Sequence, residues 1–253
     1  MATLSVKDVS LRFGGITALD GITFDVEPRQ ICGLIGPNGA GKTSLFNCVS
    51  RIYQPTSGQI LLDGDNLLAH HASGIARRGI ARTFQNLGLF PTMTFLENTM
   101  AGAYTHGRTG YLRALTRWGV AREERALRAE AYELLQRLDL AEFAFHLAAD
   151  LPFGTLKRLE LARALAARPK LLMLDEPAGG LTHAEVRELG EVICQIRDDF
   201  DLTVLLVEHH MGLVIGISDK IVAMPFGKKI AEGTSRDIQV HPEVVSAYLG
   251  TPV

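Results

Sequence analysis

The sequence has no hydrophobic run long enough to cross a membrane. A membrane-spanning helix needs about 20 consecutive apolar residues, and the most apolar stretches, 202–207 and 213–217, are short and separated by Glu208, His209 and His210. The N-terminus, MATLSVKDVS, also lacks the basic segment and apolar stretch of a signal peptide. We therefore expect that, if the protein functions at a membrane, it does so through partner proteins.

Cysteine is scarce, and neither sign of charge is in excess. The three cysteines, Cys32, Cys48 and Cys194, form no CxxC pair, so no disulfide framework is predicted and a reducing compartment fits best. The net charge of −2 gives no strong field for nucleic acid, and we expect no nucleic-acid partner. With 47% hydrophobic and 21% charged residues, a wholly disordered or fibrous chain is excluded.

Short apolar strands alternate with helices over much of the chain. Residues 4–13 alternate with a period of about two, as a half-buried strand does, and Gly14-Gly15 ends them. Further strands are predicted at 22–26, 31–35, 59–62, 80–84, 171–174, 203–207 and 220–227, and helices at 41–50, 121–138, 156–167 and 183–197. This alternation indicates an α/β fold with a parallel sheet covered on both faces and a helical lobe inserted at roughly 87–168.

A phosphate-binding loop is predicted between an apolar strand and a helix, because residues 36–43 fit G-x-x-x-x-G-K-[ST] without a mismatch. Glycines let N–H groups turn toward phosphate oxygens, and the helix presents its positive end to them. Lys42 is expected to reach the β and γ phosphates, Thr43 to bind Mg²⁺, and Ser44 to lie near the α phosphate. The predicted contacts are Gly36, Pro37, Asn38, Gly39, Ala40, Gly41, Lys42, Thr43 and Ser44. A glycine-rich turn that binds nothing is the alternative, and kinases, GTPases and motors share the loop.

Asp175 and Glu176 follow the apolar strand 171–174. In an open α/β sheet the carboxyl ends of the strands form the ligand-binding edge, so Asp175 is placed to hold Mg²⁺ through water. Glu176, one residue further, points elsewhere and is expected to polarise the attacking water as general base. The alternative is a strand that ends in a solvated acidic pair.

Between these two motifs stands Leu151-Pro152-Phe153-Gly154-Thr155, followed by a helical pattern at 157–165. With these motifs, nearly the whole chain resembles the ATPase subunits of ABC transporters, whose signature is usually Leu-Ser-Gly-Gly-Gln. The resemblance implies that N–H groups at this helix start receive the γ phosphate of the ATP held by the opposite subunit. Pro152, Phe153 and Thr155 depart from the usual residues, and an ordinary capped helix is the alternative.

The resemblance implies roles for three further residues. Gln85 matches the glutamine that reaches Mg²⁺ and the attacking water, His209 the switch histidine beside the γ phosphate, and Phe13 the aromatic residue that stacks on adenine. The alternatives are a loop glutamine, a surface histidine and a core phenylalanine, and His210 is expected to be a bystander. The implied catalytic residues are Glu176, His209, Lys42 and Gln85, and the implied metal-binding residues are Thr43, Gln85 and Asp175.

The resemblance also implies the architecture. Residues 1–253 would form a single ABC ATPase domain, with a P-loop NTPase core that has a parallel central sheet and an N-terminal antiparallel β portion. This RecA-like core would comprise 1–86 and 169–253, and the inserted helical subdomain with the signature would comprise 87–168. Residues 178–182 occupy the D-loop position, with Thr182 where the family usually has Asp.

A finer resemblance is to the ATPases of branched-chain amino acid transporters. It rests on 79–86, Leu89-Phe90, Met93-Thr94, Glu97-Asn98, 208–211 and 247–250. It implies ATP and Mg²⁺ as ligands, a second and different ATPase subunit, two transmembrane permease subunits and, indirectly, a periplasmic solute-binding protein. The implied place is peripheral, at the cytoplasmic face of the bacterial inner membrane. Importers of urea, other amides or organic acids, and the ATPase of lipopolysaccharide export, share much of this pattern.

Three other classes of protein are alternatives. A soluble ABC ATPase of DNA repair or translation usually carries two cassettes or a long coiled coil, and this sequence has neither. A catalytically silent nucleotide-binding scaffold would not need Lys42, Asp175, Glu176 and His209 together, and an ATPase assay distinguishes it. A P-loop kinase needs a site for a phosphate acceptor, which no segment suggests.

Overall fold

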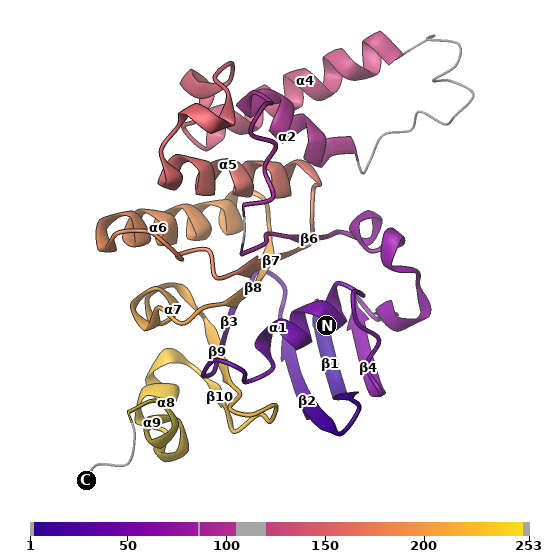
Figure 1. The fold of residues 1–253 in the computed structure, drawn as a ribbon, viewed down its shortest axis with the longest axis vertical. Coiled ribbons are helices and arrows are strands. Elements are labelled where there is room, and N and C mark those ends of the chain that lie inside the picture. The colour runs from indigo at the N-terminus through magenta and orange to yellow at the C-terminus, as the bar shows by residue number, and fades with distance from the viewer. Residues whose placement is uncertain (1–2, 86, 105–119, 250–253) are drawn as a thin grey trace. The chain divides into compact units, whose positions relative to one another are not determined.

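The computed structural model describes residues 3–85, 87–104 and 120–249 of the chain. The chain divides into two compact units, Met1–Ile75 with Lys170–Val253, named here the main unit, and Ala76–Pro169, named the helical unit. Figure 1 follows the chain through both. Asn86 and Gly250, which contributed to the finer resemblance, lie outside the described residues.

The first strands of the main unit form an antiparallel sheet in the order β2-β1-β4-β5. The strands are β1 (Leu4–Phe13), β2 (Ile16–Val26), β4 (Ser57–Leu62) and β5 (Asp65–Asn66). A register shift between Val6 and Val9 keeps the apolar side chains of β1 on the buried face. The strand predicted at 22–26 begins earlier, at Ile16, because the chain turns at Gly14-Gly15 and pairs directly back on β1.

The second sheet of the main unit is mainly parallel and carries its strands in the order β10-β9-β3-β8-β7. The strands are β3 (Ile31–Ile35), β7 (Leu171–Asp175), β8 (Thr203–Val207), β9 (Lys220–Ala223) and β10 (Ala231–Gly233). Every residue of β3, β7 and β8 is buried, as their apolar sequences predict. The parallel sheet is confirmed, whereas β10, which pairs antiparallel with β9, was not predicted. The carboxyl ends of β3, β7 and β8 lie at one edge.

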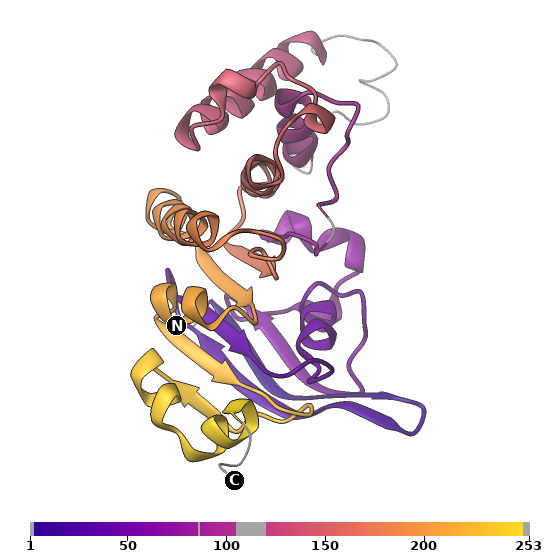
Figure 2. The ribbon, with the colours of Figure 1, turned by 60° about the vertical axis from the view of Figure 1, so that its left-hand side comes forward.

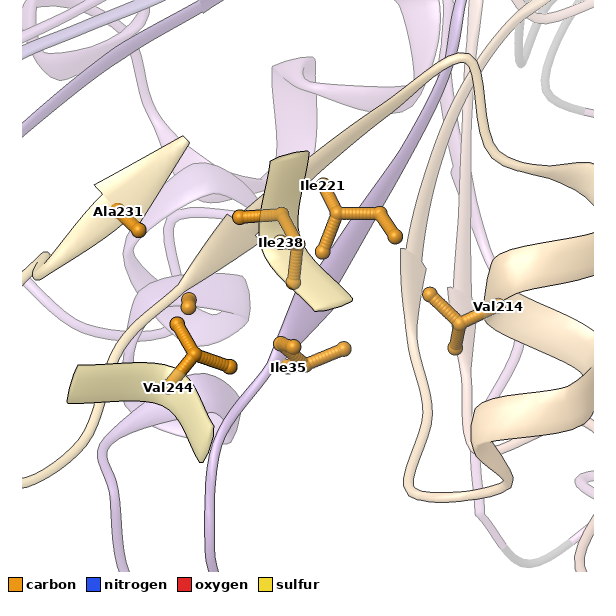
Figure 3. Close-up of a cluster of buried hydrophobic side chains, with 7 residues drawn as sticks. Ile35, Val214, Ile221, Ala231, Ile238 and Val244 are labelled. Atoms are coloured by element: carbon orange, nitrogen blue, oxygen red, sulfur yellow. The ribbon is translucent and has the colours of Figure 1, made fainter. Parts of the chain in front are cut away.

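Helices cover this sheet. They are α1 (Lys42–Val49), α6 (His183–Asp199), α7 (Met211–Ile217), α8 (Ser235–Val240) and α9 (Pro242–Leu249). Figures 1 and 2 show α6 and α7 side by side. A buried cluster joins β3, β9 and β10 to α7, α8 and α9, and its labelled members in Figure 3 are Ile35, Val214, Ile221, Ala231, Ile238 and Val244. The C-terminal segment therefore belongs to the core of the main unit.

The described part of the helical unit is built on three packed helices. They are α2 (Phe95–Ala103), α4 (Val120–Arg137) and α5 (Phe153–Ala166), and the strand β6 (Ile80–Arg82) precedes them. Thr94 and Glu97 form a capping box that begins α2. Short 3₁₀ turns complete the two units at Leu67–Ala69, Ala72–Gly74, Ala76–Arg78, Ala141–Phe143 and Ala148–Asp150. Within the described part of the chain, no helix combines the length and the apolar character needed to cross a bilayer.

A glycine sets how closely α2 approaches α5. A Cβ at Gly102 would overlap the backbone carbonyl oxygen of Arg163, so we expect Gly102→Ala to destabilise the protein by about 1–3 kcal/mol. Gly216 in α7 has open space around its Cα, and Gly216→Ala is the matched control, expected to be neutral or stabilising by up to about 1 kcal/mol. Urea unfolding of the two variants checks the contrast, and equal midpoints would contradict it.

Candidate functional site

The phosphate loop follows β3, and three of its glycines are required by its geometry. Gly39 and Gly41 have φ angles of 78° and 88°, in the left-handed region that favours glycine. A Cβ at Gly36 would overlap the carbonyl oxygen of Met224, and one at Gly41 that of Ala18. Gly41 caps α1, so the loop ends where the helix presents unpaired N–H groups and its positive end.

The ammonium of Lys42 is held at the start of this loop. Its Nζ donates to the carbonyl oxygens of Gly36 at 2.6 Å and Pro37 at 3.0 Å. Burial lowers the pKa of Lys42, and the nearby carboxylates of Glu176 and Asp175 act in the opposite direction. A buried cation, N–H donors and a helix N-terminus together make a site for a phosphorylated anion.

The acidic pair lies at the end of the neighbouring strands. Asp175 is the last residue of β7 and is buried, and the N–H of Glu176 donates to the carbonyl oxygen of Val207 at 2.9 Å. Glu176 has a φ of 48°, which costs a non-glycine residue about 1–2 kcal/mol. Its side chain is 22% exposed, so the carboxylate can reach water. Such local strain at a candidate base is typical of functional sites.

The structure brings His209 next to Glu176. The Nδ1 atom of His209 lies 3.9 Å from Oε1 of Glu176 and 3.9 Å from Oε2 of Glu208. The histidine side chain is 61% exposed, whereas Glu208 is wholly buried. His210, expected to be a bystander to the chemistry, has a structural role, because its Nδ1 accepts the N–H of Leu213 and caps α7. A carboxylate and an imidazole thus face solvent together at the end of β7 and β8.

The sequence interpretation missed the role of Glu208. Its Oε1 accepts the N–H of Ala178 at 2.8 Å, and its Oε2 accepts the N–H groups of His209 and His210, each at 2.9 Å. One signal was present in the sequence, since the charged Glu208 directly follows the apolar residues 204–207 of strand β8. That signal is weak, because most such residues are solvated.

Phe13 ends β1 and is not a core residue, since it is 46% exposed. Its ring makes an edge-to-face contact with Tyr53, with 5.2 Å between centroids. An exposed aromatic face offers a stacking surface for a planar base. Tyr53 supports this ring and was not predicted.

Gln85 and the predicted signature, residues 151–155, belong to the helical unit. Gln85 is exposed, and the N–H of its neighbour Phe84 donates to Glu160 at 3.0 Å. The helix predicted to begin at 156 begins at Phe153, with Pro152 as its N-cap. Gly154 and Thr155 therefore lie in the first turn of α5, where N–H groups have no partner within the helix. Leu151 and Pro152 precede this turn in extended backbone.

The residues of the main unit fit Mg²⁺ only as part of a metal–nucleotide complex. Thr43 is exposed in the first turn of α1 and offers a hydroxyl, and Asp175 offers a carboxylate, both hard oxygen donors. Among the described residues, no group of three or more His, Cys, Asp or Glu could hold a metal ion. Mg²⁺ usually keeps several waters and takes one or two protein oxygens plus phosphate, which agrees with this sparse donor set.

Comparisons with known proteins agree with this geometry. Residues 19–179 match the family described as ABC transporter, and residues 228–253 match the family described as branched-chain amino acid ATP-binding cassette transporter. The chain is 44% identical to the high-affinity branched-chain amino acid transport ATP-binding protein BraF of Pseudomonas aeruginosa, over 98% of this chain and 97% of the relative. It is 42% identical to the protein LivG of Escherichia coli, which has the same description, over the same shares.

Solved structures show the same fold. An ATP-binding cassette of an ABC transporter in its ADP conformation has a TM-score of 0.87, 27% identity and coverage of 99% of both chains. A nucleotide-free cassette of an ABC transporter has a TM-score of 0.85 and 27% identity over 98% of this chain and 99% of that chain. The expected combination of an α/β core with parallel strands and a separate antiparallel sheet is therefore confirmed.

Proposed function

Because the chain belongs to the ATP-binding proteins of ABC transporters, which hydrolyse ATP, we propose that it powers an importer of branched-chain amino acids. The observation that carries this proposal is the similarity to branched-chain amino acid transport ATP-binding proteins over nearly the full length, including the C-terminal segment 228–253. In that segment α8 and α9 pack into the core of the main unit. The resemblance is therefore not limited to the nucleotide motifs.

The geometry supports a hydrolytic mechanism with the following roles. The loop from Gly36 to Ser44 and the positive end of α1 bind the phosphates, with Lys42 at the β and γ phosphates. Thr43 and Asp175 would hold the Mg²⁺ that binds with ATP, and this ion would neutralise charge on the transferred phosphate. The family resemblance alone assigns Gln85 to the same metal. Glu176 takes a proton from the attacking water, His209 lies beside it near the γ phosphate, and Phe13 stacks on adenine.

The proposed assembly has two ATPase subunits that sandwich two ATP molecules. The first turn of α5, with Leu151, Pro152, Phe153, Gly154 and Thr155 as signature, serves the ATP of the opposite subunit. Hydrolysis reopens the dimer, and two permease subunits receive this motion. A periplasmic solute-binding protein delivers the amino acid, and the chain lies at the cytoplasmic face of the inner membrane through these partners.

An uptake experiment tests the proposed solute. The gene is deleted from its host and restored with either the wild-type chain or the Lys42→Ala variant, and entry of labelled leucine, isoleucine and valine is measured. We expect the wild-type chain alone to restore uptake of these three amino acids, with urea and organic acids unaffected. Normal leucine uptake in the deletion strain, with loss of urea uptake instead, would contradict the proposed solute class.

We also expect the working dimer to be a heterodimer with unequal sites. Thr155 has less reach than the usual glutamine, and Thr182 stands where the family usually has aspartate. The hydroxyl of Thr182 already donates to Glu185 at 2.7 Å and caps α6, so it has little capacity left for a partner across the dimer. Two copies of this chain would therefore supply poor signatures to each other.

The purified chain alone is expected to be monomeric and slow, and faster with the second ATPase of its host. Light scattering measures the oligomeric state and an ATPase assay measures the rate, for the chain alone and for the chain mixed with the second ATPase. The variant carrying both Thr155→Gln and Thr182→Asp should be faster alone than the wild-type chain, because it has the family's usual residues at both positions. The fold should not suffer, because Asp also caps helices well. A fast, ATP-dependent homodimer of the wild-type chain would refute the asymmetry and leave the roles of Lys42 and Glu176 untouched.

A further inference from the structure

Glu208 joins the two backbone segments that carry the candidate base and the candidate switch histidine. One carboxylate oxygen accepts the N–H of Ala178, two residues after Glu176, at 2.8 Å. The other accepts the N–H groups of His209 and His210, each at 2.9 Å. The same side chain therefore holds the ends of β7 and β8 to each other beyond the last pair of the sheet, Asp175 with Val207.

The placement of this carboxylate is costly unless all its contacts are made. Glu208 is 0% exposed, and a buried carboxylate without partners strongly destabilises a folded protein. Three N–H donors on its two oxygens offset that cost, because hydrogen bonds to a charged acceptor are stronger than neutral ones. An apolar residue at this position would continue β8 without any such cost, but it could not join the two segments.

Glu208 holds the backbone segment that contains Glu176, a residue in a strained conformation. Glu176 has a φ of 48°, and such a conformation persists only where its surroundings fix it from more than one side. The N–H of Glu176 donates to Val207, which fixes the backbone at the strained residue itself. The contact from Ala178 to Glu208 fixes the backbone just after it.

A direct chemical role does not fit the geometry. Both oxygens of Glu208 accept backbone N–H groups, and the side chain has no exposed surface through which it could reach ATP or water. The carboxylate can act only through the segments that it holds.

We propose that Glu208 is a positioning residue for ATP hydrolysis, which keeps Glu176 and His209 in their mutual arrangement, with 3.9 Å between Oε1 and Nδ1. The proposal rests on the proposed role of Glu176 as general base and deepens it. Its partners are the backbone N–H groups of Ala178, His209 and His210, so the effect does not depend on the identity of those side chains.

The variant Glu208→Gln tests the proposal, because an amide keeps the size of the side chain but offers a single acceptor atom. Its oxygen can serve either Ala178 or the two histidines, and its NH₂ group then faces N–H donors. We expect kcat to fall by about 10- to 100-fold in the chain assembled with its partners, with the Kd for ATP unchanged. Glu208→Asp, which keeps the charge but is one methylene shorter, should also lower kcat.

The matched control is Glu97→Gln. The carboxylate of Glu97 also accepts a backbone N–H, that of Thr94, at 2.8 Å, but it caps a helix of the helical unit. Glutamine is an accepted residue at this position of a capping box, so kcat should stay at the wild-type value. Thermal unfolding and ATP binding are measured on all variants to separate positioning from loss of fold.

A double-variant comparison identifies the path of the effect. In the Glu176→Gln background, Glu208→Gln should lower the residual single-turnover rate by less than about twofold, because the base, one member of the pair that Glu208 positions, is already absent. An equal loss in both backgrounds, a wild-type kcat, or parallel losses of kcat, ATP affinity and Tm would each overturn the proposal. A slow Glu176→Gln beside a normal Glu208→Gln leaves the proposed function standing, whereas a fast Glu176→Gln overturns the role of Glu176 as general base and, with it, the positioning role of Glu208.

Discussion

Glu176→Gln is expected to bind ATP with normal affinity and to hydrolyse it about 100- to 10,000-fold more slowly, because an amide cannot accept the proton of the attacking water. The substitution preserves the size of the side chain, and the left-handed backbone at this residue costs Gln about as much as it costs Glu. The substitution also changes the contact between Glu176 and His209, at 3.9 Å. Single-turnover hydrolysis and equilibrium ATP binding are the two measurements.

The same variant should hold the ATPase dimer closed, since binding continues while hydrolysis, which reopens the dimer, does not. Sedimentation in ATP should show a persistent dimer with the partner chain for Glu176→Gln and a transient one for the wild type. Glu188→Gln, an exposed glutamate on α6, is the control and should hydrolyse at the wild-type rate. Hydrolysis by Glu176→Gln at the wild-type rate in the assembled complex would show that another group is the base.

Lys42→Ala is expected to abolish tight ATP binding or turnover. The ammonium is the lysine charge expected at the β and γ phosphates, and its loss leaves the carbonyl oxygen of Gly36 without its side-chain donor. We expect the Kd for ATP to rise by at least about 100-fold, or turnover to become undetectable, as removal of a buried charge-assisted contact predicts. Isothermal titration and ATPase assays check both readouts.

Lys170→Ala is the matched control for this substitution. Its ammonium pairs with Asp63 at 2.6 Å on the surface of the same unit, and exposed pairs contribute little. This variant should bind and hydrolyse ATP like the wild type. Near-normal ATPase activity of Lys42→Ala in the assembled complex, with the fold intact by circular dichroism, would contradict the assignment of the phosphate loop.

The strands that lead into the site could be predicted because their signals are local. An unbroken apolar run predicts a buried strand wherever it occurs in the chain, and β3, β7 and β8 consist mostly of such runs. The glycine spacing of the loop likewise fixes its backbone without help from distant residues. The positions of Lys42, Asp175 and Glu176 at one sheet edge follow from these two signals.

Two kinds of feature could not be predicted from the sequence: those with a weak or misleading local pattern, and those in which distant segments of the chain meet. The helix α7 contains Gly212 and Gly216 in a short apolar stretch, which gives no amphipathic period, and a side-chain cap from His210 begins it. Pro152 suggests a loop in the sequence, yet its ring-fixed φ, here −58°, is compatible with the N-cap position, and α5 starts directly after it. The three N–H groups that meet at Glu208 come from segments 30 residues apart.

The central claim is that ATP hydrolysis by this chain drives branched-chain amino acid import, and transport by the complex in liposomes tests it most directly. The wild-type chain, its partner ATPase and the two permeases are reconstituted with MgATP at the ATPase face, and binding protein and labelled leucine are supplied at the other. We predict leucine accumulation that requires ATP and proceeds together with phosphate release, with both lost in Glu176→Gln. Accumulation of leucine without ATP, or at the wild-type rate in Glu176→Gln, would contradict the account.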